Sequence, residues 1–250
     1  ATVVDLHNAG GVPAIMGELS SMLDVGAKNV SGQTVKEIIK DNRSTDTSVL
    51  TTIEDPVFAS GGIAVLKGSL APSGAIGRIT TIPDNRMIHR GPARVFHSDE
   101  DAYQAVTTGK IQAGDVIIIR YEGPVGAPGM REMMMTTDAL VGAGKADDVF
   151  VVTDGRFSGF TEGSAIGHVA PEAAIGGPIA IVEEGDPVMI DIPSRKLNLD
   201  ISEKEITKRL EDWSPSPAKV KRGILAVYAK TALQAHEGAM IDDRLRNIES

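Results

Sequence analysis

The chain has 250 residues, of which 42% are hydrophobic and 24% charged, and its formal net charge is -9. The composition is that of a globular protein, and the negative charge argues against nucleic acid or a membrane surface as partner, since both attract clustered Lys and Arg. The absence of cysteine excludes disulfides, a catalytic thiol and any iron–sulfur site formed by these residues alone. Because no signal-peptide pattern and no run of 18 apolar residues is present, we expect a cytoplasmic protein.

The first 58 residues are predicted to form only short helices. Apolar spacing after Pro13 suits a helix within GGVPAIMGELSSML, and the capping-box pattern of Thr34 and Glu37 opens a second helix, TVKEIIKD. Residues 41–58 are polar and poorly periodic, which is typical of a linker. We therefore expect residues 1–58 to be the end of one domain with its linker, and residues 59–250 to be a second domain.

Short β-rich runs separated by Gly, Pro and Asp dominate the second domain. Strands are predicted in GIAVLKG, GAIGRIT, ARVF, DVIIIRY, DDVFVVT, PIAIVEEGD, PVMIDI and RKLNLDI. Helices are predicted at 99–109 after the N-cap Ser98, at 131–144, in SEKEITKRLEDW after Ser202, and at 220–235. Because the strands outnumber the helices and cluster, we expect an α/β fold with a barrel or folded sheet flanked by helices.

A glycine- and proline-rich loop, residues 120–132, follows the apolar strand DVIII and precedes a predicted helix. Glycine lets backbone N–H groups approach a ligand closely, and Glu132 falls in the first turn of the helix. The loop is either part of a ligand site or a tight turn in which Glu132 complements the helix dipole.

A second glycine-rich loop, TDGRFSGFTEG at 153–163, directly follows the strand DDVFVV. It carries Asp154, Arg156, Ser158, Thr161 and Glu162, and loops at the carboxyl ends of strands are where α/β folds place ligands. The alternative is a solvated surface loop. No histidine lies near enough in sequence to indicate a Ser-His-Asp triad, and His168, which follows the loop, is interpreted as a structural residue.

Five segments in consecutive order resemble the dihydroxy-acid and phosphogluconate dehydratase family. They are GGIAVLKGSLAPSGAI, GPARVFHSDEDAYQAV, GDVIIIRYEGPVGAPGMREM, VVTDGRFSGFTEG and GHVAPEAAIGGPIAIVEEGD, within residues 60–200. The resemblance implies a C-terminal β-barrel with flanking helices, of the swivelling β/β/α kind, preceded by a short helical remnant of an N-terminal domain. That N-terminal domain, which this chain lacks, would hold a 2Fe-2S or 4Fe-4S cluster.

The resemblance also implies roles for particular residues. Ser158, in the family motif G-R-F-S-G, would be the proton acceptor, and Glu132, in G-M-R-E, would be a ligand of Mg²⁺. Thr161 is expected to contact the substrate, as is Arg131, because arginine before the glutamate resembles the branched-chain enzymes rather than the sugar-acid enzymes.

The function implied is the C-terminal part of a dihydroxy-acid dehydratase, a hydro-lyase. It would convert 2,3-dihydroxy-3-methylbutanoate and its methylpentanoate analogue to 2-oxo acids in valine and isoleucine biosynthesis. We expect the chain to pack against its own N-terminal domain, the complete enzyme to be a homodimer, and this chain alone to be inactive. The alternatives are a sugar-acid or 6-phosphogluconate dehydratase and, in another class, a stand-alone binding domain without catalysis.

Overall fold

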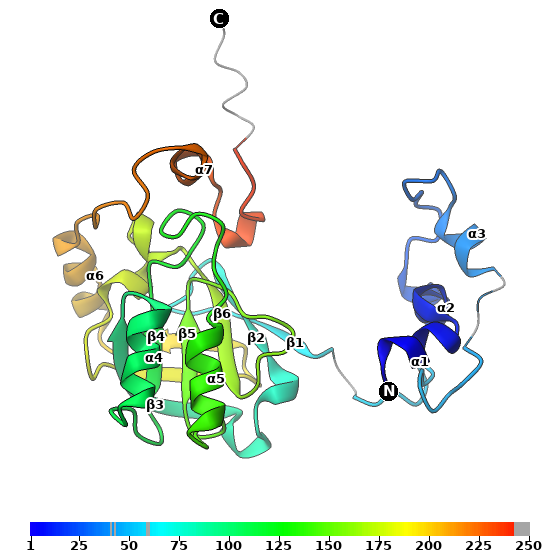
Figure 1. Cartoon of the computed structure of the whole chain (residues 1–250), viewed down its shortest axis with the longest axis horizontal. Coiled ribbons are helices and arrows are strands. Elements are labelled where there is room, and N and C mark those ends of the chain that lie inside the picture. Colours follow the sequence, from blue (N-terminus) through cyan, green and yellow to red (C-terminus); the bar gives the residue numbers. More distant parts are fainter. Residues whose placement is uncertain (41, 43, 59–60, 243–250) are drawn as a thin grey trace, which may run out of the picture. The chain divides into compact units, whose positions relative to one another are not determined.

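The computed structural model describes residues 1–40, 42, 44–58 and 61–242. It divides into two compact units, Ala1–Gly61 and Gly62–Ser250, each described by itself (Figure 1). Residue 59, the expected start of the second domain, lies outside the described residues, as do residues 41 and 43 of the expected linker. None of the helices in the described ranges is long and apolar enough to cross a membrane.

The first unit consists of short helices. They are α1 (Val3–Asn8), α2 (Gly11–Glu18), the 3-10 helix η1 (Ser20–Met22) and α3 (Val35–Ile39). The predicted capping box of α3 is confirmed, since the Thr34 hydroxyl accepts the Glu37 N–H at 3.2 Å and the Glu37 carboxylate accepts the Thr34 N–H at 2.7 Å. Residues 44–58, within the expected linker, contain no helix or strand.

Eight strands of the second unit form one sheet within the described residues. Its order is β1-β2-β6-β5-β4-β3-β7-β8, with parallel pairing from β3 to β6 and antiparallel pairing on both sides. The strands are β1 (Ile63–Leu66), β2 (Gly74–Arg78), β3 (Ile88–Phe96), β4 (Val116–Ile119), β5 (Phe150–Thr153), β6 (Ser164–Ala170), β7 (Pro187–Asp191) and β8 (Lys196–Leu199). Lys67, after β1, forms a bridge with Lys196 of β8, so the sheet is a nearly closed barrel.

Helices flank this barrel, as Figure 1 shows for α4 and α5 in front of the sheet. The helices are α4 (Asp99–Thr107), α5 (Met134–Gly142), α6 (Glu203–Asp212) and α7 (Ile224–Thr231). The 3-10 helices are η2 (Ile79–Thr81), η3 (Asp84–Arg86), η4 (Ala173–Ile175), η5 (Pro178–Ile181) and η6 (Ala235–Glu237). The predicted class, an α/β fold with a barrel and flanking helices, is therefore confirmed.

The two faces of the central strands explain why their sequences are apolar throughout. All four residues of β4 are buried, and side chains alternate between the faces of a strand. Val116 and Ile118 join the barrel core, whereas Ile117 and Ile119 join the cluster under α4 and α5. Burial on both faces fixes β4 in the middle of the sheet, so the loop that follows it has a rigid base.

The segment PIAIVEEGD was predicted to be a strand, and this prediction is wrong. Residues Pro178–Ile181 form the 3-10 helix η5, and residues 182–186 form no strand either. Pro178 has no N–H to give to a sheet, and the Arg120 side chain donates to the carbonyls of Ile179, Ala180 and Val182. These backbone acceptors are therefore satisfied without a neighbouring strand.

Several boundaries also differ from the prediction, among them those of the helix expected at 220–235, which spans only Ile224–Thr231, and one strand was missed. Helix α5 begins at Met134 rather than at residue 131, because the buried Asp99 carboxylate of α4 accepts the N–H groups of Met135 and Thr136, at 3.1 Å each. Strand β3 begins at Ile88, before the predicted ARVF, and β6 was not predicted. The predicted N-caps Ser98 and Ser202 are confirmed, each accepting an N–H at 3.2 Å.

Gly91 of β3 tests the packing of the barrel. A Cβ atom there would lie 2.0 Å from the Gly114 carbonyl oxygen, whereas a Cβ at Gly142, the last residue of α5, would meet no atom within 4 Å. We expect Gly91→Ala to lower the free energy of unfolding by about 1–3 kcal/mol, since the backbone at Gly114 must shift. Urea unfolding followed by circular dichroism measures this. Gly142→Ala is the control, and equal effects of the two changes would contradict the packing argument.

Candidate functional site

Three loops meet at the carboxyl edge of the parallel strands, where α/β folds place their ligands. The buried carboxylate of Asp154, after β5, accepts the N–H groups of Tyr121 at 3.1 Å, Glu122 at 2.9 Å and Ala173 at 2.8 Å. One side chain thus connects the ends of β4, β5 and β6. The two glycine-rich loops picked out in the sequence are neighbours in the fold.

Burial determines the electrostatics of this junction. Burial raises the pKa of Asp154 to about 7, although its three backbone donors favour the ionised form. Glu172 is a second carboxylate of this kind, whose pKa burial also raises. It accepts the N–H groups of Val125 and Gly126 and the side-chain amide of Gln234. Gly123 must be glycine, because a Cβ would lie 2.6 Å from a Glu172 carboxylate oxygen.

The loop that carries Ser158 is held in a tight turn. The Ser158 hydroxyl oxygen accepts the Phe160 N–H at 3.0 Å, and the Ser158 carbonyl accepts the Thr161 N–H at 3.3 Å. The Arg78 guanidinium, at the end of β2, donates to the carbonyls of Gly159 and Thr161. The position of the serine therefore depends on an arginine that lies 80 residues earlier in the chain.

Ser158 and Thr161 line one pocket of about 190 Å³. Thr161 is 7% exposed, and its hydroxyl has no hydrogen-bond partner among the described residues. A buried hydroxyl without a partner costs free energy, which a ligand that hydrogen-bonds to it can recover. The other lining residues include the apolar side chains of Ile63, Ile76 and Phe157.

Sequence reasoning missed three polar residues of this pocket, Arg78, Thr81 and His168. His168 was interpreted as a structural residue, yet it lines the same pocket as Ser158 and has a left-handed backbone, with φ of 57°. Burial lowers the pKa of His168, and the charge of Arg156 lowers it further, so a neutral imidazole is favoured. No local pattern signals Arg78, because its place in the pocket follows from the pairing of β2 with β6.

Glu132 lies beside the serine loop through its backbone. The Arg156 N–H donates to the Arg131 carbonyl at 3.2 Å, and the Met133 N–H donates to the Arg156 carbonyl at 3.0 Å. Glu132 does not line the pocket of Ser158, and its carboxylate has no hydrogen bond or ion pair among the described residues. Its expected role as a metal ligand stays a prediction.

Arg131 has a different partner from the one expected. Its guanidinium forms an ion pair with Glu100 of α4 at 2.7 Å, and both side chains are about half exposed. The structure therefore does not bring Arg131 into the pocket with Ser158 and Thr161. Its expected substrate contact stays a prediction.

The residues of this chain do not fit a complete metal or cluster site. Within the described ranges, no group of three His, Cys, Asp or Glu side chains is placed to hold a metal ion. The whole sequence has no cysteine to supply a thiolate for an iron–sulfur cluster. Glu132 is thus at most one ligand of a cation whose other ligands come from elsewhere.

The hydrogen bonds of Arg78 predict the stability of the serine loop. We expect Arg78→Met to speed hydrogen exchange at Phe160 and Thr161 about tenfold or more, since two hydrogen bonds of about 1 kcal/mol each are lost. Exchange is measured by NMR or mass spectrometry. Arg90→Met, which removes an exposed ion pair with Asp200, is the control and should leave the loop unchanged. Unchanged exchange in Arg78→Met would show that the loop does not depend on this arginine.

The raised pKa of Asp154 predicts a pH dependence of stability. The folded state favours the protonated acid, so above the usual carboxyl pKa of about 4 the free energy of unfolding falls as pH rises toward 7, by up to about 1.4 kcal/mol per pH unit. Asp154→Asn removes this contribution but loses a hydrogen-bond acceptor at every pH. We expect the destabilisation by Asp154→Asn to be about 2–3 kcal/mol smaller at pH 8 than at pH 5. Urea unfolding at both pH values measures it, and an equal loss would contradict the raised pKa.

Comparison with known proteins places the chain in a family. Residues 48–239 match the family model described as dihydroxy-acid/6-phosphogluconate dehydratase C-terminal. A protein named dihydroxy-acid dehydratase from Acetivibrio thermocellus is 48% identical over 244 residues, which are 97% of this chain and 44% of that protein. Its namesake from Caldanaerobacter subterraneus subsp. tengcongensis is 49% identical over 240 residues, 95% of this chain and 43% of the relative.

An archaeal protein of the same name, from Methanococcus aeolicus, is 46% identical over 239 residues, 96% of this chain and 43% of its own length. The chain thus spans less than half the length of these curated relatives. The resemblance found in the sequence motifs is confirmed. This chain belongs to the dihydroxy-acid/6-phosphogluconate dehydratase family, whose C-terminal domain it contains.

Proposed function

We propose that the chain is the part of a dihydroxy-acid dehydratase that supplies the proton acceptor, Ser158. The observation that carries this proposal is the pocket in which the Ser158 loop lies beside the buried, unpartnered hydroxyl of Thr161. The substrates would be 2,3-dihydroxy-3-methylbutanoate and its methylpentanoate analogue, converted to 2-oxo acids in valine and isoleucine biosynthesis. The names of the curated relatives support this reading.

The proposed reaction removes a proton from C2 and the hydroxyl group from C3, and the resulting enol rearranges to the 2-oxo acid. A serine hydroxyl takes a proton only when it is held as the alkoxide. The Phe160 N–H, which donates to the Ser158 oxygen at 3.0 Å, is a fixed donor toward that negative charge. The positive charge of Arg78, which lines the same pocket, acts in the same direction.

The cofactors we propose for the complete enzyme are Mg²⁺ and an iron–sulfur cluster. The Mg²⁺ ion would stabilise the negative charge that develops on the substrate. This chain would contribute Glu132 alone, because it contains no cysteine and no complete ligand set among its described residues. We therefore propose that the chain is inactive without the N-terminal domain, and that the complete enzyme is a cytoplasmic homodimer.

Part of the pocket wall suits a branched-chain substrate. Ile63, Ile76 and Phe157 offer no hydrogen bond to a hydroxyl group, whereas Thr81, Thr161 and His168 of the same lining can form one. The methyl branches of the proposed substrates suit this wall.

Ser158→Ala in the complete enzyme tests the proposal. We expect kcat to fall by at least about 10²-fold with little change in KM, since the proton acceptor is lost but the pocket remains. Turnover of 2,3-dihydroxy-3-methylbutanoate is measured anaerobically with Mg²⁺, beside gluconate and 6-phosphogluconate. Ser194→Ala, in the exposed turn between β7 and β8, is the matched control.

Retained turnover in Ser158→Ala would contradict the assignment, and loss in His168→Gln would then make His168 the acceptor. Preference of the unmodified enzyme for a sugar acid would replace the substrate but keep the chemistry. Absence of turnover in an enzyme loaded with cluster and Mg²⁺ would favour a binding domain without catalysis.

A further inference from the structure

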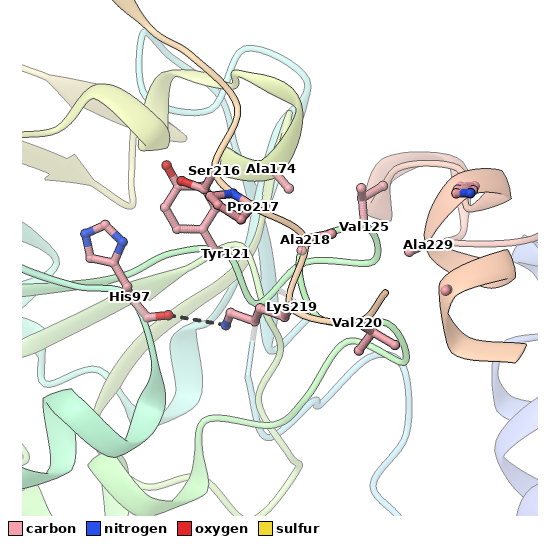
Figure 2. Close-up of a pocket in the computed structure, with 13 residues that line it drawn as sticks. His97, Tyr121, Val125, Ala174, Ser216, Pro217, Ala218, Lys219, Val220 and Ala229 are labelled. Carbon is pink, nitrogen blue, oxygen red and sulfur yellow. Dashed lines mark hydrogen bonds between the residues drawn. The ribbon is translucent and has the colours of Figure 1, made fainter. Parts of the chain in front are cut away.

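A second cavity, of about 300 Å³, lies at the same edge of the sheet and shares no lining residue with the pocket of Ser158 (Figure 2). Its floor is formed by His97 and Tyr121, which follow β3 and β4. Its sides are the Val125–Gly126 turn, helix α7, and residues 216–220, which we term the strap. A cavity of this size at the ends of parallel strands is typical of small-molecule sites.

Most of the cavity wall is formed by small or branched apolar side chains. They come from the loop of residues 120–132, η4, the strap and α7: Val125, Ala174, Pro217, Ala218, Val220, Ala226 and Ala229. Figure 2 shows Val125 of the loop, Ala229 of α7 and the strap residues among the side chains that line the cavity. Short side chains on all sides leave room for a short branched carbon chain, whose burial here is favourable.

Two lysines line this cavity, and one of them, the solvent-exposed Lys230, has no counterion among the described residues. Lys219 of the strap donates to the fully buried Glu122 carboxylate at 2.9 Å and to the His97 carbonyl at 3.3 Å, so its charge is balanced. Lys230 of α7 lines the cavity and has no ion pair or hydrogen bond among the described residues. The Arg120 guanidinium carbon lies 5.7 Å from the centre of the Tyr121 ring.

No carboxylate lines the cavity to oppose Lys230. Glu122 is engaged by Lys219, and the pKa of His97 is lowered by burial and by the charge of Arg120, which favours a neutral imidazole. A ligand with a negative charge would therefore gain from the charge of Lys230, whereas a neutral ligand would not. A single ammonium group suits a single carboxylate, whereas a phosphate would keep unmatched charge.

We propose that this cavity binds a short-chain carboxylate with a branched aliphatic tail. Its carboxylate would pair with Lys230, and its tail would pack against the valines and alanines of the wall. The proposal does not rest on the proposed function, because the site uses neither Ser158 nor any other residue of the serine pocket.

Trp213, the only tryptophan of the chain, provides a direct readout of binding. It stands three residues before Ser216, which lines the cavity, and it packs on Gly176, where a Cβ would lie 2.9 Å from its ring. Gly176 in turn follows the lining residue Ala174 by two positions. A ligand that orders the strap and η4 should therefore change the Trp213 fluorescence.

The experiment titrates the 250-residue chain with 3-methyl-2-oxobutanoate and follows Trp213 fluorescence, with calorimetry as a second measurement. We expect a saturable change. We expect binding weaker by about tenfold or more for 3-methylbutan-2-one, which lacks the carboxylate, and for acetate, which lacks the branched tail. Absence of saturable binding by either method would overturn the proposal, as would equal affinity for the ketone.

Matched variants locate the site. Lys230→Gln should weaken binding about tenfold or more, whereas Lys221→Gln, on an exposed lysine outside the lining, should not. Ala229→Leu should weaken binding by filling the cavity, with circular dichroism as the check on folding. Equal effects of the two lysine changes would overturn the assignment.

Discussion

The carboxylate of Asp154 is the interaction on which the functional edge of this fold depends. Desolvation of a carboxylate is costly, and only hydrogen bonds can offset the cost inside a protein. Asp154 accepts three backbone N–H groups, from Tyr121, Glu122 and Ala173, so each of three loops is held by the same atom group. A change in the ionisation of Asp154 therefore acts on all three loops together.

The two cavities share no lining residue, and the loops joined by Asp154 contribute to both. Ser158 follows Asp154 by four residues and lines one pocket, whereas the Tyr121 ring forms part of the floor of the other. Glu122, whose N–H donates to Asp154, pairs with Lys219 of the strap. The serine loop, the loop of residues 120–132 and the strap are thus connected through Asp154 and Glu122. Because the Glu122 carboxylate is fully buried, its pairing with Lys219 is screened less by salt than a pair with both partners exposed.

Local patterns were sufficient to predict the parts of the fold whose cause is local. The capping box of Thr34 and Glu37 and the N-cap Ser98 need only neighbours in the chain. The errors have distant causes: Asp99 of α4 sets the start of α5, and Arg120 satisfies the carbonyls that η5 would otherwise offer to a sheet. Strand β6 carries Gly167 and two alanines, Ala165 and Ala170, and these residue types are depleted in strands.

The candidate site follows the same division. Ser158 and Thr161 could be picked out because they lie together in one glycine-rich loop after a buried strand. Arg78, which holds that loop, reaches it only because β2 pairs with β6 across the sheet. A sequence therefore shows which groups can do chemistry, while the pairing of distant strands decides which arginine holds them. Arg131 was expected to contact the substrate because of its neighbours in the sequence. In the fold, its guanidinium pairs instead with Glu100 of α4, which lies 31 residues earlier in the chain.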